Sequence, residues 1–311
     1  MATSTPPPLS LAVSPALAPA HGTARTRLTA LLQLTKPRLA FFSILSAMAA
    51  YAAAAPGLGY IHLLLAFAGI SLSAGGALSF NQWWERRIDG RMRRTASRPL
   101  PQGAVSPRAA LTFSMILCAA GPALLAFTAN PVSAALAALI IVLYGLVYTP
   151  MKRRSLWATE VGSVSGALPP LLGAAAAGDV WNTSAWMLAV LLLFWQMPHF
   201  YGIGWMHRDD YRAAGFRLLP ALDSSGGRTA RRSFVYTVLL AAFAPVPWLA
   251  GWAGPVYALV AVPGALFMLA RARAFLQAPE PRAAAARALF LASVLYLPPL
   301  FAAVVLDRFL F

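Results

Sequence analysis

Acidic residues are scarce in this sequence. Only nine of its 311 residues are Asp or Glu, against 25 Lys and Arg, and charged residues make up 11% of the chain. In a soluble domain about a quarter of the residues are charged, so the composition excludes an ordinary soluble fold. Cys118 is the one cysteine, which excludes an intramolecular disulfide and a cysteine-based metal site. The sequence also lacks a glycine-rich phosphate loop of the G-x-x-x-x-G-K-[ST] type, so any phosphate must be held in another way.

Long apolar runs fill most of the chain instead. Hydrophobic residues make up 59% of the sequence, and runs of about 20 residues, long enough to cross a bilayer, recur along it. We recognise about nine such runs by this criterion: residues 39–55, 60–80, 109–128, 131–149, 156–178, 185–205, 234–253, 254–271 and 287–306. The sequence therefore predicts an all-α polytopic membrane protein with about nine transmembrane helices.

The positive charges lie in alternate connections between these runs. If the N-terminus lies inside, 24 of the 25 Lys and Arg residues fall in inside segments, and only Arg308 falls on the other side. Because Lys and Arg accumulate in cytoplasmic loops, we expect a cytoplasmic N-terminus, an odd number of spans and a C-terminus outside. This distribution accounts for the net charge of +16 without a nucleic-acid partner and makes the lipid bilayer the expected partner.

The first 33 residues differ from the rest of the chain. They are rich in Pro, Ala, Ser and Thr, contain no acidic residue and lack the continuous apolar segment of a secretory signal peptide. We expect residues 1–33 to form a disordered cytoplasmic tail, with an organellar transit peptide as the less favoured interpretation. Residues 34–311 are expected to form a single transmembrane domain.

One acidic cluster follows the second apolar run. Asn81, Glu85 and Asp89 are spaced four residues apart, so on a helix their side chains share one face. Their oxygens suit a hard cation such as Mg²⁺, and we expect all three to be metal ligands. Four arginines follow, at positions 91, 93, 94 and 98, and could neutralise a phosphate. The alternative is a solvated helix end in which the acids pair with neighbouring arginines.

A second acidic cluster follows the sixth apolar run. Asp209 and Asp210 are adjacent, so they cannot both face one way on a helix. We expect one of them, Asp210 or Asp209, to bind a second Mg²⁺ and the other to pair with an arginine. The alternative is an interfacial loop of charge pairs. Together the two clusters predict a diphosphate held through Mg²⁺ and arginine, and a membrane location suits a lipid diphosphate whose tail lies between apolar helices.

The sixth run ends with Trp195-Gln196-Met197-Pro198-His199-Phe200. Pro198 removes a backbone hydrogen bond from the span, and the freed polar groups need a buried partner or a cavity. A histidine beside them is therefore a candidate ligand-contacting residue. The alternative, weighed equally, is a histidine whose hydrogen bonds are satisfied by a neighbouring helix.

Several motifs occur in a fixed order between residues 34 and 220. They are Leu34-Thr-Lys36-Pro37-Arg38, Asn81-x₃-Glu85-x₃-Asp89-x₂-Met92-x-Arg94-Thr95-x₂-Arg98, Tyr148-Thr-Pro-x-Lys152-Arg153, Gly166-Ala-x-Pro169-Pro170-x₂-Gly173, Trp195-Gln-x-Pro198-His199-Phe200 and Asp209-Asp210-Tyr211-x₃-Gly215-x₃-Leu219-Pro220. In this order they resemble the UbiA superfamily of intramembrane prenyltransferases. Within it they resemble most the protohaem IX farnesyltransferase (haem O synthase) branch, because the Trp-Gln-x-Pro-His-Phe segment distinguishes that branch from the quinone and chlorophyll branches.

The resemblance implies a fold, a reaction and a set of partners. The fold would be nine transmembrane helices around a central cavity, with both acidic loops on the cytoplasmic side. The reaction would transfer farnesyl from farnesyl diphosphate to a vinyl group of haem b, with water completing a hydroxyethylfarnesyl side chain and Mg²⁺ as cofactor. The setting would be a bacterial inner membrane, less favourably a mitochondrial one, with a haem A synthase as the partner that takes the product.

The resemblance also assigns roles to residues outside the acidic clusters. The expected catalytic set is Asn81, Glu85, Asp89, Asp209 and Asp210, the diphosphate-binding set is Lys36, Arg38, Arg94, Arg98, Lys152 and Arg153, and the haem-binding set is His199, Trp195 and Gln196. The chain departs from the family's usual asparagine at Thr159, which is followed by Glu160, and we expect this acid to pair with Arg154 or Lys152.

Two alternative functions use the same features. An aromatic prenyltransferase of quinone synthesis would keep the chemistry and change the acceptor, but the Pro198-His199 segment argues against it. A transporter would also have many spans and a basic inner face. The acids argue against a transporter, because they cluster at one membrane face and not at the mid-depth where carriers bind their substrates.

Overall fold

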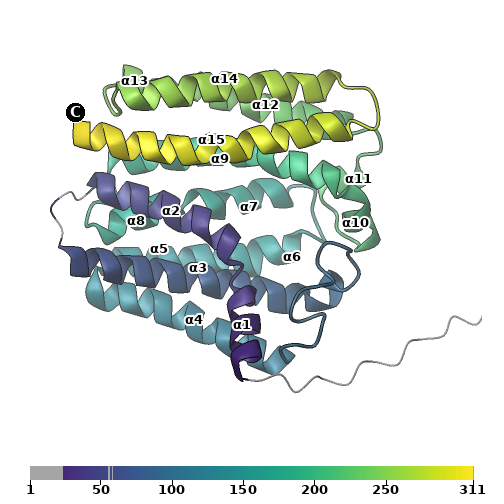
Figure 1. Ribbon diagram of the computed structural model, residues 1–311, viewed down its shortest axis with the longest axis horizontal. Helices are drawn as coiled ribbons and strands as arrows, with labels where there is room; N and C mark the ends of the chain where they lie inside the picture. The colour runs from purple at the N-terminus through teal and green to yellow at the C-terminus, as the bar shows by residue number, and fades with distance from the viewer. Residues whose placement is uncertain (1–23, 55–56, 58, 311) are drawn as a thin grey trace, which may run out of the picture.

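The computed structural model describes residues 24–54, 57 and 59–310. Its elements are all helices, and the long ones run side by side in one bundle (Figure 1). In chain order they are α1 Ala24–Leu34, α2 Pro37–Ala54, α3 Tyr60–Asp89, α4 Pro107–Thr128, α5 Pro131–Val142, the π-helix η1 Leu143–Tyr148, α6 Thr149–Met151, α7 Ala158–Ala167, α8 Pro169–Ala176, α9 Thr183–Met206, α10 Arg208–Ala213, α11 Leu219–Leu222, α12 Gly227–Phe243, α13 Val246–Leu249, α14 Pro255–Gln277 and α15 Ala283–Leu310.

Within this described part, eight segments are long and apolar enough to cross a membrane: Pro37–Ala54, Tyr60–Asp89, Pro107–Thr128, Pro131–Met151, Thr183–Met206, Gly227–Leu249, Pro255–Gln277 and Ala283–Asp307. Each coincides with one of the predicted runs. The prediction of an all-α polytopic membrane protein is therefore confirmed, and the turn that separates the seventh and eighth runs lies between α13 and α14, as expected.

The remaining predicted run, residues 156–178, forms a broken helix. Its two halves are α7 and α8, of 10 and 8 residues, which follow one another along the bundle and meet at Leu168 (Figure 1). The break comes there because Pro169 and Pro170 have no N–H to donate to the preceding turn. Eight of the nine predicted runs therefore form helices long enough to span a membrane, and the run at residues 156–178 is divided into two shorter helices.

Close packing fixes the second half of this broken helix. At Gly173 in α8, a Cβ atom would lie 1.8 Å from the carbonyl oxygen of Ala47 in α2. Only glycine allows the two backbones to approach this closely. The contact anchors α8 on α2 at the end of the bundle opposite to the acidic clusters (Figure 1).

A π-helical turn interrupts the fourth span near its end. The span runs through α5, η1 and α6, and π-turns inside α-helices occur frequently at functional sites. The Thr149 hydroxyl donates to the carbonyl oxygen of Tyr144, five residues earlier, at 2.8 Å. This turn sets Thr149 against α3, where its oxygen accepts a hydrogen bond from Asn81.

The structure corrects one prediction at the N-terminal side. Residues 24–33 were expected to be disordered, but they belong to helix α1. The helix is held because Ala30 and Leu34 are buried against Val105 and Ala110. The predicted tail was therefore wrong for residues 24–33, and its residues 1–23 lie outside the described part of the chain.

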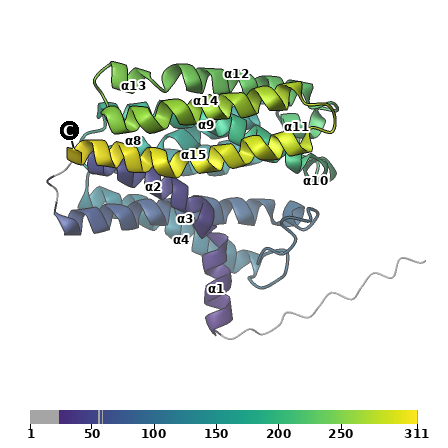
Figure 2. The same ribbon diagram turned by 45° about the horizontal axis from the view of Figure 1, so that its top comes forward.

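Both acid-bearing segments lie at one end of the bundle. The connection that follows α3 and the short helices α10 and α11 occupy the same end, whereas α15 ends at the opposite end (Figures 1 and 2). This arrangement brings together two segments that are more than 100 residues apart in the sequence. α1 packs against residues at the end of the connection that follows α3.

Candidate active site

The site begins with a row of polar side chains on α3. Asn81, Glu85 and Asp89 are only 1%, 4% and 1% exposed, respectively. Because α3 continues without interruption to Asp89, the four-residue spacing places all three on one face, as predicted. The acids are thus buried inside the end of the bundle, which contradicts a solvated helix end, although Asp89 does pair with one of the neighbouring arginines, Arg98.

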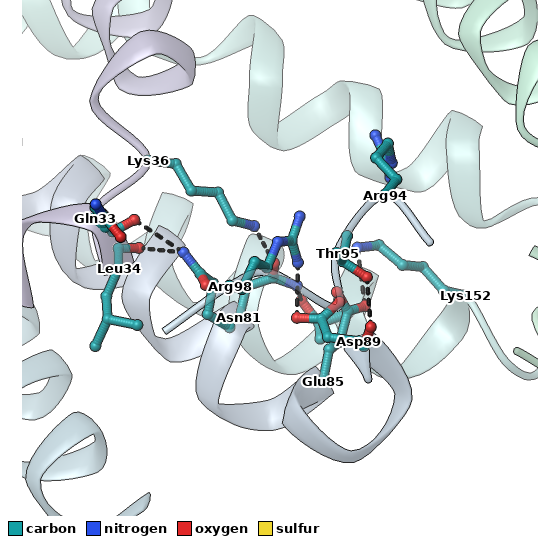
Figure 3. A network of polar contacts seen from close by, with 12 residues as sticks. Gln33, Leu34, Lys36, Asn81, Glu85, Asp89, Arg94, Thr95, Arg98 and Lys152 are labelled. Carbon is teal, nitrogen blue, oxygen red and sulfur yellow. Dashed lines mark hydrogen bonds and ion pairs between the residues drawn. The ribbon is translucent and has the colours of Figure 1, made fainter. Parts of the chain in front are cut away.

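A cation from a different segment meets each of these three side chains (Figure 3). The Lys36 ammonium, in the turn between α1 and α2, donates to Asn81 Oδ1 at 2.7 Å. The Lys152 ammonium, directly after α6, lies 3.0 Å from Glu85 Oε1, and the Arg98 guanidinium lies 2.7 Å from Asp89 Oδ2. Three of the six predicted diphosphate-binding residues therefore line the α3 face. We call the three α3 side chains and their three cations the paired row: Asn81 with Lys36, Glu85 with Lys152 and Asp89 with Arg98.

Backbone geometry directs Lys36 toward α3. Lys36 adopts a left-handed conformation with φ 47°, which a residue with a Cβ adopts at an energetic cost. The side-chain amide of the buried Gln82 donates to the carbonyl oxygens of Gln33 and Leu34 and so holds the end of α1 on α3. Burial and the nearby Arg98 charge lower the pKa of Lys36 to about 7, so its ammonium can lose its proton near neutral pH.

The buried oxygens of the paired row fit a hard cation. Asp89 Oδ1 is buried and accepts no hydrogen bond, although buried polar atoms normally have a partner. Glu85 and Asp89 supply carboxylate oxygens and Asn81 supplies an amide oxygen, which are the ligand types that Mg²⁺ prefers. No group of three or more His, Cys, Asp or Glu side chains arranged for a metal ion occurs among the described residues. Two carboxylates are nevertheless the usual protein contribution where substrate phosphates and water complete the Mg²⁺ shell.

The second cluster separates its two aspartates. The Asp209 side chain is 75% exposed and lies 4.0 Å from the Arg208 guanidinium and 3.8 Å from that of Arg212. Asp210 is half-buried and, among the described residues, forms no hydrogen bond or ion pair. Asp209 is therefore the arginine partner that the sequence led us to expect, and Asp210 is the aspartate available for a ligand.

Hydrogen bonds join the two acid-bearing segments. Arg94 donates to the Tyr211 hydroxyl at 3.0 Å, and its guanidinium lies 5.5 Å from the centre of the Tyr211 ring. The backbone N–H of Arg217 donates to the carbonyl oxygen of Lys152 at 2.8 Å. These contacts join three segments into one structural unit: the loop after α3, the residues after α6, and α10 with the residues that follow it.

His207 lies beside this unit. Burial and the nearby Arg94 charge lower the pKa of His207, while the Asp210 charge acts to raise it.

Not every predicted cation meets the paired row. Arg38 and Arg153 are exposed, and their side chains form no hydrogen bond, ion pair or ring contact with other described residues. Lys152, in contrast, lies 4.6 Å from the centre of the Tyr148 ring. Burial disfavours the charge of Lys152, but Glu85 outweighs burial and raises its pKa, so this ammonium stays charged.

The three predicted haem-contacting residues lie on α9, and neighbouring helices hold them. The Trp195 indole donates to the carbonyl oxygen of Ser293 at 2.8 Å. The Gln196 amide nitrogen donates to the carbonyl oxygens of Ser163 and Leu192. The Gln196 amide oxygen lies so close to α7 that a Cβ at Gly166 would be 2.0 Å from it. The polar groups of Trp195 and Gln196 are therefore engaged in packing between helices.

His199 combines features of both interpretations offered by the sequence. Its Nδ1 lies 2.9 Å from Ser293 Oγ on α15, so one nitrogen is satisfied by a neighbouring helix. Its Nε2 has no hydrogen-bond partner among the described residues. The ring stacks on Trp195 with the centroids 4.9 Å apart and contacts Phe290 at the same centroid distance.

Glu160 does not pair as the sequence led us to expect. Lys152 is occupied by Glu85, and Arg154 is exposed. Glu160 instead accepts hydrogen bonds from Arg232 in α12 and, at 2.6 Å, from the Tyr201 hydroxyl in α9. The prediction of a pair with Arg154 or Lys152 was therefore wrong, because the packing of the bundle places Arg232 and Tyr201, which are distant in sequence, within hydrogen-bonding distance of Glu160.

Sequence reasoning missed three residues that hold the candidate site residues in place. Gln82 follows Asn81 directly and Thr149 lies within the Tyr148-Thr-Pro motif, so their position was the signal available to find them. Ser293 lies in an apolar run without other polar residues nearby, and nothing in its surroundings distinguishes it.

The chain is similar to known proteins both in sequence and in fold. Residues 43–294 match the model of the UbiA prenyltransferase family. A protoheme IX farnesyltransferase of Opitutus terrae is 41% identical over 277 residues, which cover 89% of this chain and 94% of the relative. A protoheme IX farnesyltransferase of Solibacter usitatus is 37% identical over 288 residues, with coverage of 89% and 98%.

Solved structures agree with this match at the level of the fold. A UbiA homolog from Aeropyrum pernix superposes with a TM-score of 0.70 at 20% identity and covers 88% of this chain and 98% of its own. A UbiA homolog from Archaeoglobus fulgidus bound to GPP and Mg²⁺ superposes with a TM-score of 0.65 at 14% identity, with coverage of 88% and 99%. The family match extends over most of the chain and includes both acid-bearing segments, and the chain therefore belongs to the UbiA prenyltransferase family.

Proposed function

We propose that this protein transfers the farnesyl group of farnesyl diphosphate to a vinyl group of haem b. Farnesyl C1 bonds to the outer vinyl carbon, water then adds to the inner vinyl carbon with loss of a proton, and the products are haem O and diphosphate. The observation that carries the proposal is the paired row, in which three buried oxygen-bearing side chains of α3 each meet a cation. The full-length similarity to proteins named protoheme IX farnesyltransferase supports the identity of the acceptor.

The α3 face and α10 would hold the metal in this reaction. Asn81, Glu85 and Asp89 are the proposed Mg²⁺ ligands on one side, and Asp210 is the proposed ligand on the other. When bound, Mg²⁺ neutralises the charge that develops on a departing diphosphate. The UbiA homolog whose structure contains GPP and Mg²⁺ supports a prenyl diphosphate and a divalent metal as ligands of this fold.

The cations of the paired row would bind the diphosphate. Lys36, Arg98 and Lys152 already point at the buried carboxylates and the amide, so we infer that they turn to the diphosphate oxygens when substrate enters. Breaking the bond between farnesyl C1 and oxygen sends the electron pair to diphosphate and leaves an allylic cation. These three donors stabilise the leaving group, and burial of the site keeps water from the cation before the vinyl carbon attacks it.

The other predicted residues would place the acceptor. Arg38, Arg94 and Arg153 are exposed cations. We keep Arg38 as a proposed diphosphate contact, and we propose that Arg94 and Arg153 meet the diphosphate or the haem propionates, with Arg94 oriented by Tyr211. His199 is the proposed contact for the haem itself. We assign it no role as a base in the first step, because an alkene that attacks an allylic cation needs no prior deprotonation.

The proposed setting is a bacterial inner membrane. The Lys and Arg distribution supports a cytoplasmic N-terminus and a cytoplasmic position for both acid-bearing segments. In this orientation the site opens to the compartment where charged diphosphates are dissolved. A haem A synthase is the proposed consumer of the product. The quinone-type and transporter alternatives receive no support from the relatives' names.

The proposal is tested with the purified full-length protein in lipid nanodiscs. Farnesyl diphosphate, Mg²⁺ and haem b are supplied together, diphosphate release is measured, and the porphyrin product is identified by mass spectrometry. We expect haem O to form, and diphosphate to be released only when haem b is present. Equal release with an aromatic acid in place of haem b, or no haem O at all, would contradict the proposal.

A further inference from the structure

One residue of α15 holds two residues of α9. Ser293 is fully buried. Its carbonyl oxygen accepts the Trp195 indole N–H at 2.8 Å, and its hydroxyl oxygen lies 2.9 Å from His199 Nδ1. Trp195 and His199 are four residues apart and share a face of α9, so Ser293 contacts that face through both its backbone and its side chain.

The position of the Ser293 hydroxyl proton follows from a second distance. Ser293 Oγ lies 2.6 Å from the carbonyl oxygen of Phe290. Two oxygens at this separation require a proton between them, because otherwise their lone pairs repel. A carbonyl has no proton to give, so the hydroxyl must donate to Phe290 and cannot also donate to His199.

This arrangement determines the tautomer of His199. Since Ser293 Oγ can only accept from the imidazole, Nδ1 must carry the hydrogen. Nε2 of a neutral imidazole then holds a free lone pair, and this atom has no partner among the described residues. The ring cannot turn easily, because Trp195 stacks on it and Phe290 packs against it.

We propose that Ser293 is a positioning residue, which fixes His199 as the Nδ1–H tautomer and keeps the Nε2 lone pair free to bind the iron of the haem acceptor. The identity of this ligand rests on the proposed function. The arrangement follows a general rule, in which a metal-binding histidine donates its other N–H to a fixed acceptor that sets its tautomer and orientation.

The first experiment measures the tautomer without any ligand. The protein contains four histidines, so ¹⁵N labelling of histidine gives four pairs of side-chain resonances, and the His199→Gln variant identifies the pair of interest. We expect His199 to be the Nδ1–H tautomer in the wild type. In Ser293→Ala the acceptor is lost, and we expect the Nε2–H form to appear.

The second experiment measures haem binding by the same variants. Titration with ferric haem b, followed by its absorption spectrum, should show a dissociation constant about 10- to 100-fold higher in Ser293→Ala than in the wild type, as is typical when a partner of a metal ligand is removed. The spectral change of iron–imidazole binding should weaken with it. Ser293→Thr keeps the hydroxyl and should restore both properties, while affinity for farnesyl diphosphate stays constant in every variant.

Ser114→Ala is the matched control. Ser114 is also fully buried and also donates to the carbonyl three residues earlier, at 2.8 Å, but it contacts no histidine. It should leave haem affinity unchanged. An Nε2–H tautomer in wild-type His199, or wild-type haem affinity in Ser293→Ala, would overturn the assignment of Ser293. A wild-type protein that binds no haem b would instead refute the proposed function, and the tautomer measurement would still decide whether Ser293 fixes His199.

Discussion

Replacement of Asp89 by asparagine should lower the catalytic rate strongly and change the free energy of unfolding only slightly. The substitution keeps the size of the side chain and an oxygen that can accept from Arg98, but it removes the negative charge. Removal of one electrostatic partner from an active site lowers the rate by about 10²- to 10³-fold, or about 2.7–4 kcal/mol. We expect a fall of this size in kcat for diphosphate release by Asp89→Asn.

The free energy of unfolding should change much less. Asp89→Asn weakens a charge-assisted hydrogen bond of 2.7 Å to Arg98, and bonds of this class contribute about 1.5–3 kcal/mol to stability. The Arg98 side chain is 23% exposed and can return to water, while the buried Asp89 Oδ1 has no partner to lose. Asp89→Asn also removes the cost of burying a negative charge, which offsets part of the weakened bond, so the net loss of stability should be about 1 kcal/mol.

The assay compares initial rates of diphosphate release with thermal unfolding of the same preparations. Asp209→Asn is the matched control, because Asp209 is mostly exposed and its ion pairs are 3.8 and 4.0 Å long. It should keep both the rate and the unfolding midpoint of the wild type. A wild-type rate in Asp89→Asn, or a rate loss fully explained by unfolded protein, would refute the reasoning.

Four further outcomes are expected. Removal of divalent metal with EDTA should abolish diphosphate release and Mg²⁺ should restore it; full activity in EDTA would contradict a metal at the paired row. Asp210→Ala should lower kcat by about 10²-fold or more, and a rate like that of Asp209→Asn would remove it from the site. Arg98→Lys keeps the charge but loses the planar fork, so it should raise KM for farnesyl diphosphate, and a KM equal to that of the wild type would argue against substrate contact. Lys36 has a pKa lowered to about 7 from 10.5, so between these values the unfolded chain binds a proton that the folded chain does not, and stability should rise with pH there. The midpoint temperature of thermal unfolding, measured on metal-free protein between about pH 7 and 9, should therefore rise more with pH in the wild type than in Lys36→Met. The same pH dependence of the midpoint in both proteins would contradict the lowered pKa.

The helical row on α3 could be predicted because its information is local. The four-residue spacing of Asn81, Glu85 and Asp89 places them on one face wherever the helix continues, and α3 does continue through them. Their partners could not be predicted from spacing. Lys36 is 45 residues from Asn81, and Lys152 is 67 residues from Glu85, so only the packing of the bundle brings these cations to α3.

Two errors have the same physical origin. Glu160 was matched with cations near it in sequence, whereas its partners are 41 and 72 residues away. Residues 24–33 have the composition of a tail, but α1 becomes ordered by packing against residues that follow the first acidic cluster. In both cases contacts distant in sequence outweighed local composition. The break at Leu168, in contrast, has a local cause, because Pro169 and Pro170 lie within the predicted run. A criterion based on hydropathy and length alone does not take account of prolines that break a helix.

The paired row has a consequence for the order in which ligands bind. Glu85 and Asp89 balance Lys152 and Arg98, and Lys36 adds a charge that is lost near pH 7. A divalent cation that arrives alone must enter beside these positive groups, and a diphosphate that arrives alone must enter beside the carboxylates. When both arrive together, each offsets the charge that repels the other. Metal and diphosphate should therefore bind with positive cooperativity, and by reciprocity each should raise the affinity of the other by the same factor.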